Sequence, residues 1–273
     1  MFTYLQPKTV TEAVDMLHTH EDIRIMAGGT DMLVAVRDGE PCRYLMDIKH
    51  IAGMDAIEAT GSGLSIGGAV VLNKLMSSEH VTGCYSVLND AGLRFAHHNL
   101  RNRATLVGNL CSALPGGDMI GASLVLGGYI EAASKEGTRS IPLSEFFVGL
   151  MTNALRKDEL ALRVVFPRRD GKGIYLKKQR VRGHDLAQVG VTMFRGSDGS
   201  FDLALGAVAK TTVLLKDVVK AGEEPRPDKI IETALANINP RSGVRCSREY
   251  RIEIVQHFIR QAVAILDGKE AAV

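Results

Sequence analysis

The segment 26-MAGGTDMLVAV-36 places two adjacent glycines, a threonine and an aspartate between two apolar runs. Two structures fit this pattern: a plain tight turn, or a loop whose successive backbone N–H groups bind an anion such as a phosphate. The segment has neither the GxGxxG nor the GxxxxGK(S/T) spacing of the best-known phosphate motifs. Taken alone, it favours a structural turn.

A second passage with the same residue types is 105-TLVGN-109. Thr105, Gly108 and Asn109 again combine a hydroxyl, a bare backbone and a polar side chain that can form hydrogen bonds. Two such loops in one chain could bind both sides of a pyrophosphate. The pair therefore favours phosphate binding over two unrelated turns.

Asp118 follows a rigid Pro-Gly-Gly corner, in 115-PGGD-118. Its carboxylate could accept hydrogen bonds from the hydroxyl groups of a ribose. Aspartate is also a favoured N-cap residue, and an apolar helix is expected over 119–127. The two roles do not exclude each other.

The composition is that of an ordinary globular protein, with 45% hydrophobic and 23% charged residues among 273. The 33 basic and 31 acidic residues give a net charge of +2, so nothing indicates binding to nucleic acid. No apolar run reaches membrane-spanning length, and the N-terminus has no signal-peptide pattern. We therefore expect no membrane insertion and a cytoplasmic location.

The cysteines and the adjacent His97 and His98 do not indicate a metal site. The four cysteines are far apart, without CxxC spacing, and reduced thiols are the simplest interpretation. Adjacent histidines do not face the same way on a helix, so solvated or helix-terminal histidines are expected. The basic run 177-KKQRVRGHD-185 could contact an anion, but its alternation favours a solvated strand face. No GxSxG or HExxH motif indicates a catalytic site.

The composition changes at 167-PRRDGKG-173, which we take as a domain boundary. Strands and helices alternate before it, whereas a β-meander and two helices are expected after it. The expected strands cover 23–26, 44–48, 129–134, 160–166, 174–182, 186–196 and 201–209, and the expected helices cover 72–82, 84–97, 119–127, 227–237 and 246–267.

These motifs, in this order, resemble the FAD-binding medium subunit of the molybdenum hydroxylases, the xanthine dehydrogenase and carbon monoxide dehydrogenase family. The resemblance runs through nearly the whole chain. The segments that carry it are 1-MFTYLQPKTVTEAVDML-17, 26-MAGGTDMLV-34, 103-RATLVGNLCSALPGGDMIGASLVLGG-128, 177-KKQRVRGHDLAQVGV-191, 204-ALGAVAKTTVLL-215 and 247-SREYR-251.

The resemblance implies an α+β fold of the p-cresol methylhydroxylase and vanillyl-alcohol oxidase type. Two subdomains, about 1–52 and 53–167, would form an FAD-binding domain over 1–167. Residues 168–273 would form a C-terminal domain with a three-stranded antiparallel sheet and helices, in agreement with the predicted meander.

The family's cofactor-binding residues carry over position by position. Main-chain donors from Ala27 through Asp31 would surround the pyrophosphate of a non-covalently bound FAD. Asp118 would bind the adenosine ribose, Phe95 would lie near the flavin, and Lys177 would contact the isoalloxazine region. The implied cofactor-binding residues are Met26, Ala27, Gly28, Gly29, Thr30, Asp31, Phe95, Thr105, Gly108, Asn109, Asp118 and Lys177.

Two positions depart from the family's pattern. Val107 stands where the family has a glycine, which replaces one close backbone approach by a β-branched side chain. Leu114 stands where the family has a serine, so one hydrogen bond to the cofactor is in doubt. We expect FAD to bind despite both changes.

The implied function is electron transfer. Electrons from a molybdenum–pterin centre on a large subunit would pass through 2Fe–2S clusters on a small subunit to FAD on this chain, and then to NAD⁺ or another acceptor. No metal ligand or catalytic side chain is expected here, because the flavin carries the chemistry. Two alternatives stay open: a self-contained flavin-dependent oxidase on the same fold, and a cofactor-free scaffold subunit.

Overall fold

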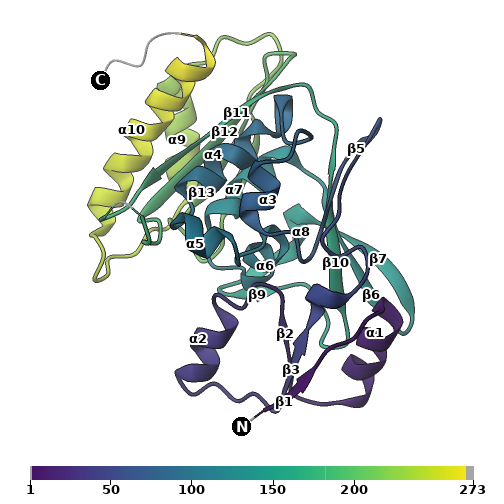
Figure 1. Ribbon diagram of the computed structural model, residues 1–273. Coiled ribbons are helices and arrows are strands. Elements are labelled where there is room, and N and C mark those ends of the chain that lie inside the picture. The colour runs from purple at the N-terminus through teal and green to yellow at the C-terminus, as the bar shows by residue number, and fades with distance from the viewer. Residues whose placement is uncertain (1, 182, 269–273) are drawn as a thin grey trace.

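The computed structural model describes residues 2–181 and 183–268 (Figure 1). Within these residues the strands form three sheets and one short hairpin, with helices between and outside the sheets. The combination of a parallel sheet with antiparallel sheets confirms the predicted α+β class. No helix in this part of the chain has the length and apolar character needed to cross a membrane.

The first sheet is parallel and has the strand order β1-β3-β2. Thr9 is the N-cap of the helix that follows the first strand, because the Thr9 Oγ1 accepts a hydrogen bond from the Glu12 N–H at 3.1 Å. Strand β2 ends at Met26, as predicted, so the AGGTD loop (residues 27–31) begins at the end of a strand. The elements are β1 (Thr3–Leu5), α1 (Val10–Thr19), β2 (Ile23–Met26), α2 (Met32–Arg37), β3 (Tyr44–Asp47) and the 3-10 turn η1 (Ile48–His50).

The second sheet is antiparallel and has the order β4-β5-β10-β6-β7. Apolar side chains of its central strands and of the helices that cover it form the largest buried cluster. Ala13 of α1 and Leu160 of β10 belong to a smaller cluster that joins the first sheet to the second. The strands are β4 (Ile57–Thr60), β5 (Gly63–Gly67), β6 (Tyr129–Ser134), β7 (Gly137–Pro142) and β10 (Leu160–Pro167).

Between the strands of the second sheet lie short helices and a hairpin. Helix α7 is buried along its whole length, because it packs between the second sheet and the third. The elements are α3 (Leu72–Met76), η2 (Gly83–Tyr85), α4 (Ser86–Arg94), α5 (His98–Arg101), α6 (Leu106–Ser112), α7 (Asp118–Leu126), α8 (Leu143–Phe146), β8 (Phe147–Gly149) and β9 (Thr152–Asn153).

The third sheet is antiparallel, has the order β11-β12-β13-β14, and is covered on its outer face by the two C-terminal helices (Figure 1). Its fourth strand was not predicted, so the expected three-stranded count is corrected to four. Asp217 has a φ of +50° where the pairing of β13 with β14 shifts register, so side chains along this strand do not alternate between buried and exposed as a regular strand would. The elements are β11 (Gly171–Lys178), β12 (Val189–Gly196), β13 (Phe201–Gly206), β14 (Val213–Val219), α9 (Pro227–Asn237) and α10 (Arg248–Leu266).

Two other expectations are corrected. The helix expected over 72–82 ends at Met76, where two serines follow. The passage 105–109, expected as a loop, lies at the start of helix α6. The expected boundaries after residues 52 and 167 stay predictions.

Candidate functional site

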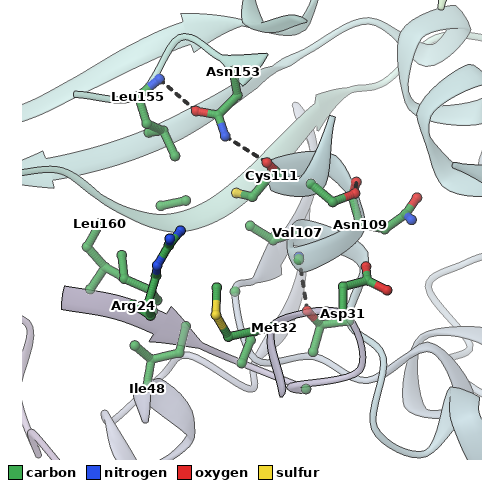
Figure 2. Close-up of a pocket in the computed structure, with 18 of the residues that line it drawn as sticks. Arg24, Asp31, Met32, Ile48, Val107, Asn109, Cys111, Asn153, Leu155 and Leu160 are labelled. Carbon is green, nitrogen blue, oxygen red and sulfur yellow. Dashed lines mark hydrogen bonds between the residues drawn. The ribbon is translucent and has the colours of Figure 1, made fainter. Parts of the chain in front are cut away.

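A cavity of about 400 Å³ lies between the AGGTD loop and helix α6. This volume is within the range of pockets that hold small molecules and cofactors. Figure 2 shows Arg24, Ile48 and Leu160 on one side of the cavity. Asp31 and Asn109 lie on the other side.

Both glycine passages meet at this cavity. Among its lining residues are nine of the twelve predicted site residues, namely Ala27, Gly28, Gly29, Thr30, Asp31, Phe95, Thr105, Gly108 and Asn109. Met26, Asp118 and Lys177 are buried residues that do not line it. The fold therefore brings together two glycine passages that are far apart in the chain, at 27–31 and 105–109. Their contact with a cofactor stays a prediction.

The two glycines of the AGGTD loop have separate structural reasons. A Cβ atom on Gly28 would lie 1.9 Å from the Arg103 carbonyl oxygen and 3.1 Å from the Ala104 Cα, so the loop packs directly on the backbone that leads into α6. Gly29 has a φ of +74°, which favours glycine. The loop is thus a turn that also forms one side of the cavity.

The opposite side is formed by the first turn of α6. Thr105 is the N-cap of this helix, and its Oγ1 accepts a hydrogen bond from the Gly108 N–H at 3.0 Å. A Cβ on Gly108 would approach that oxygen to 2.6 Å, which explains the glycine without a ligand. Val107 lines the cavity and is 3% exposed, whereas Leu114 does not line it.

Asn109 connects this helix to the next one. Its Oδ1 accepts a hydrogen bond from the Met119 N–H at 3.2 Å, near the start of α7. Asn109 therefore satisfies a helix N–H group that has no partner within its own helix. The side chain predicted to bind a cofactor also fixes the relative position of two helices.

Three residues that the sequence analysis missed support the AGGTD loop from behind. The Lys49 Nζ donates hydrogen bonds to the Ala27 carbonyl oxygen at 3.2 Å and to the Asp47 Oδ1 at 2.7 Å. The Tyr4 hydroxyl donates to the Asp47 Oδ2 at 2.5 Å. Burial acts to raise the pKa of Asp47, but the hydrogen bonds from Lys49 and Tyr4 outweigh it and lower that pKa. The feature of the sequence that could have identified Asp47 is its place at the end of an apolar strand.

Asp118 and Lys177 form a buried ion pair. The Lys177 Nζ donates to the Asp118 Oδ2 at 2.8 Å and to the carbonyl oxygens of Arg94 and Asp185 at 3.0 and 2.9 Å. These three acceptors use all the donors of the ammonium group. Lys177 is therefore buried, and not on the solvated face expected for the basic run 177–185. Arg182 of this run lies outside the described residues.

The second oxygen of Asp118 is also occupied. The Tyr175 hydroxyl donates to the Asp118 Oδ1 at 2.6 Å. Burial raises the pKa of Asp118 against the opposing charge of Lys177, and it raises the pKa of Tyr175 as well. The alternative role of Asp118 as an N-cap is wrong, because Gly117 is the N-cap of α7 and Asp118 is its first residue. The ribose-binding role stays a prediction.

His97 is helix-terminal, as expected. It is the N-cap of α5, and its Nδ1 accepts a hydrogen bond from the Leu100 N–H at 3.3 Å. Its ring also meets the His184 ring edge to face, with centroids 5.9 Å apart. These contacts explain His97 without a metal ion.

The remaining side of the cavity is formed by residues 153–159, which we call the 153–159 wall. The Asn153 Nδ2 donates to the Cys111 carbonyl oxygen at 2.7 Å, and the Asn153 Oδ1 accepts from the Leu155 N–H at 2.9 Å (Figure 2). The wall has no glycine and no familiar motif, so the sequence analysis did not identify it.

Cys111 gives a test of the cavity. Burial of its thiol raises the pKa to about 12, and the thiolate is the form that reacts with alkylating agents. We expect iodoacetamide at pH 8 to modify Cys111 more slowly than Cys42, Cys84 or Cys246, as followed by peptide mass mapping. A saturating cofactor should slow Cys111 further and leave the other three rates unchanged. Equal protection of all four cysteines would contradict this placement.

Comparison with known proteins identifies the family. Residues 1–169 match the family described as the FAD binding domain in molybdopterin dehydrogenase. The chain is 29% identical to the nicotine 6-hydroxylase medium subunit of Paenarthrobacter nicotinovorans, over 95% of each chain. It is 26% identical to the putative xanthine dehydrogenase FAD-binding subunit of Escherichia coli, over 98% of each chain.

The fold is similar to a solved enzyme structure as well. A chain of carbon monoxide dehydrogenase from Hydrogenophaga pseudoflava superimposes with a TM-score of 0.90 at 27% identity, over 98% of this chain and 97% of that one. The predicted resemblance and the predicted fold are confirmed. The chain belongs to the family of FAD-binding domains of molybdopterin dehydrogenases, with the FAD-binding medium subunits of xanthine and carbon monoxide dehydrogenase-type oxidoreductases among its relatives.

Proposed function

We propose that this chain is the FAD-carrying subunit of a molybdenum hydroxylase complex. In this role it passes electrons from the 2Fe–2S clusters of a small partner subunit to NAD⁺ or another acceptor, and a large partner subunit carries the molybdopterin. The observation that carries the proposal is the cavity between two glycine passages, in a chain whose relatives are named as medium and FAD-binding subunits.

The residues present fit a dinucleotide. The AGGTD loop and the start of α6 face each other across the cavity with little side-chain bulk, which suits a pyrophosphate. Arg24 and Lys157 add positive charge to the lining. When bound, FAD accepts and donates electrons singly or in pairs, while this chain binds and orients it. We propose that the bound FAD is contacted by the residues from Ala27 through Asp31 and by Thr105, Gly108 and Asn109.

Val107 is compatible with this role. Its side chain belongs to the large apolar cluster and is almost fully buried, although it also reaches the cavity lining. The glycine of the family's pattern is therefore replaced by a residue that packs into the protein. The boundaries of the FAD-binding domain and the cytoplasmic location remain parts of the proposal.

The test is an FAD titration of the purified full chain, alone and co-expressed with its neighbouring subunits. We expect one FAD for each chain, detected by flavin absorbance and by a change in flavin fluorescence. A chain that stays colourless in both forms would support the scaffold alternative. Reduction of the FAD-loaded chain by a small alcohol or phenol, without partner subunits, would instead support the self-contained oxidase.

A further inference from the structure

The 153–159 wall connects β9 to β10 and lines the side of the cavity that neither the AGGTD loop nor α6 forms. Leu155, Arg156, Lys157 and Glu159 all line the cavity. The wall contains no regular helix or strand between Asn153 and Leu160. Besides one backbone hydrogen bond, from the Ala154 N–H to the Phe146 carbonyl oxygen at 2.9 Å, its position depends on side-chain contacts at its two ends.

One end is held by Asn153, whose amide bonds to α6 as described above. The other end is held by Glu159, whose side chain is 1% exposed. The Glu159 carboxylate accepts hydrogen bonds from the Arg139 Nε at 2.6 Å and the Arg139 Nη2 at 2.9 Å. It also accepts from the Arg156 N–H at 2.6 Å and the Arg156 Nε at 3.1 Å. One carboxylate thus joins the wall to β7.

Glu159 is ionised at neutral pH. The hydrogen bond from Arg139 is the main cause that lowers its pKa below the ordinary value of 4.5, and Arg156 adds to it. Hydrogen bonds to an ionised carboxylate are about twice as strong as neutral ones. The four bonds at Glu159 therefore give the wall one well-defined position.

The wall also presents a positive charge to the cavity. Arg156 is neutralised by Glu159 and, at 3.0 Å, by Glu136. Lys157 lines the cavity and forms no ion pair within the described residues. The contacts of Glu159 hold the backbone on one side of Lys157 in place.

The wall lies at the end of the cavity that is away from Asp31. Figure 2 shows Leu155 and Leu160 on the same side as Arg24 and Ile48, away from Asp31. The His184 ring contacts the ring of His97, which lies two residues after Phe95, and its charge interacts with Asp31. The segment that carries Phe95 therefore reaches the end of the cavity at Asp31. With the flavin placed at Phe95, as the family resemblance implies, the end at Leu160 remains for the adenosine. Apolar side chains with a guanidinium nearby suit a planar purine.

We propose that Glu159 is a positioning residue, and that by holding the 153–159 wall against the adenylate half of the cofactor it makes this chain select FAD over FMN. FMN has the isoalloxazine, the ribityl chain and one phosphate but no adenylate. The inference rests on FAD binding by this chain. It assigns the selectivity to a side chain that acts by holding the wall in position.

The test compares FAD and FMN binding to the cofactor-free full chain, or to its complex if that is the form that binds flavin. In Glu159→Gln we expect the Kd for FAD to rise about ten-fold or more, since a charge-assisted network is lost, and the Kd for FMN to change less than about two-fold. The readout is the ratio of the Kd for FAD to the Kd for FMN, with both constants measured by flavin fluorescence. A general loss of folding would raise both constants together.

The matched control is Glu136→Gln. Glu136 also pairs with Arg156, but its side chain is 74% exposed and does not line the cavity, so both constants should stay unchanged. If Glu159→Gln does not fold, Arg139→Gln removes two of the four hydrogen bonds at Glu159 from outside the cavity and should raise the ratio of the FAD Kd to the FMN Kd as well. An unchanged ratio in the variant that folds overturns the proposal. If the unmodified chain binds no FAD, the proposed function fails instead.

Discussion

Gly28→Ala should destabilise the protein by about 3 kcal/mol and abolish measurable FAD binding. The added Cβ would lie 1.9 Å from the Arg103 carbonyl oxygen, a backbone atom that no side-chain rotation can move away. The AGGTD loop must therefore separate from the segment leading into α6, which opens the cavity between them. Chemical denaturation gives the free energy of unfolding, and flavin fluorescence gives the affinity.

Gly61→Ala is the control for this prediction. Gly61 lies in the turn between β4 and β5, and a Cβ there meets no atom within 4 Å. We expect the free energy of unfolding of Gly61→Ala to differ from that of the unmodified protein by less than about 0.5 kcal/mol, with FAD affinity retained. A Gly28→Ala protein as stable as Gly61→Ala would show that the loop does not pack on Arg103 as described.

Lys177→Met should destabilise the protein by about 3–5 kcal/mol, the usual cost of removing one partner from a buried ion pair. The change leaves the Asp118 carboxylate buried without its cation, and it leaves the carbonyl oxygens of Arg94 and Asp185 without a donor. Lys178→Met is the neighbouring control, because no side-chain contact of Lys178 supports the ion pair. Thermal and chemical denaturation measure the difference.

The pH dependence of Lys177→Met separates this cause from a packing defect. Burial already holds the pKa of Asp118 above its ordinary value of 3.8, and loss of Lys177 removes the charge that opposed this rise. A carboxyl whose folded-state pKa is raised stabilises the fold below its unfolded pKa, and this contribution is lost as pH rises through the folded-state pKa. The variant should therefore be least impaired at acid pH. A loss of stability that does not depend on pH would contradict the assignment. Adding Asp118→Asn to Lys177→Met should recover part of the lost stability.

The sequence predicted well those elements whose signals are local. Strand β2 ends before the two glycines because Gly29 must turn the chain, and both features can be recognised within a few residues. Helix α9 has the predicted bounds, Pro227–Asn237, since proline fits the first turn of a helix and an apolar stripe follows. Strand β6 also has its predicted bounds.

Features that depend on distant partners were not predictable in this way. Lys177 has the same local pattern as an exposed strand lysine, and only the fold reveals its contact with Asp118, 59 residues away. Glu159 is one acid among several charged residues until Arg139 is placed beside it. The first turn of α6 has the composition of a glycine loop, because Gly108 is needed for space beside the Thr105 cap and not for flexibility.

The contact between Gly28 and the Arg103 backbone limits how this protein can be redesigned. The AGGTD loop touches the segment that leads into the second glycine passage, so neither passage can be lengthened or displaced without moving the other. A site enlarged for a bulkier synthetic flavin must therefore gain its room elsewhere. The 153–159 wall is anchored at its ends by the side chains of Asn153 and Glu159, and an engineer who wants a broader cofactor range should begin by varying its length and these anchors.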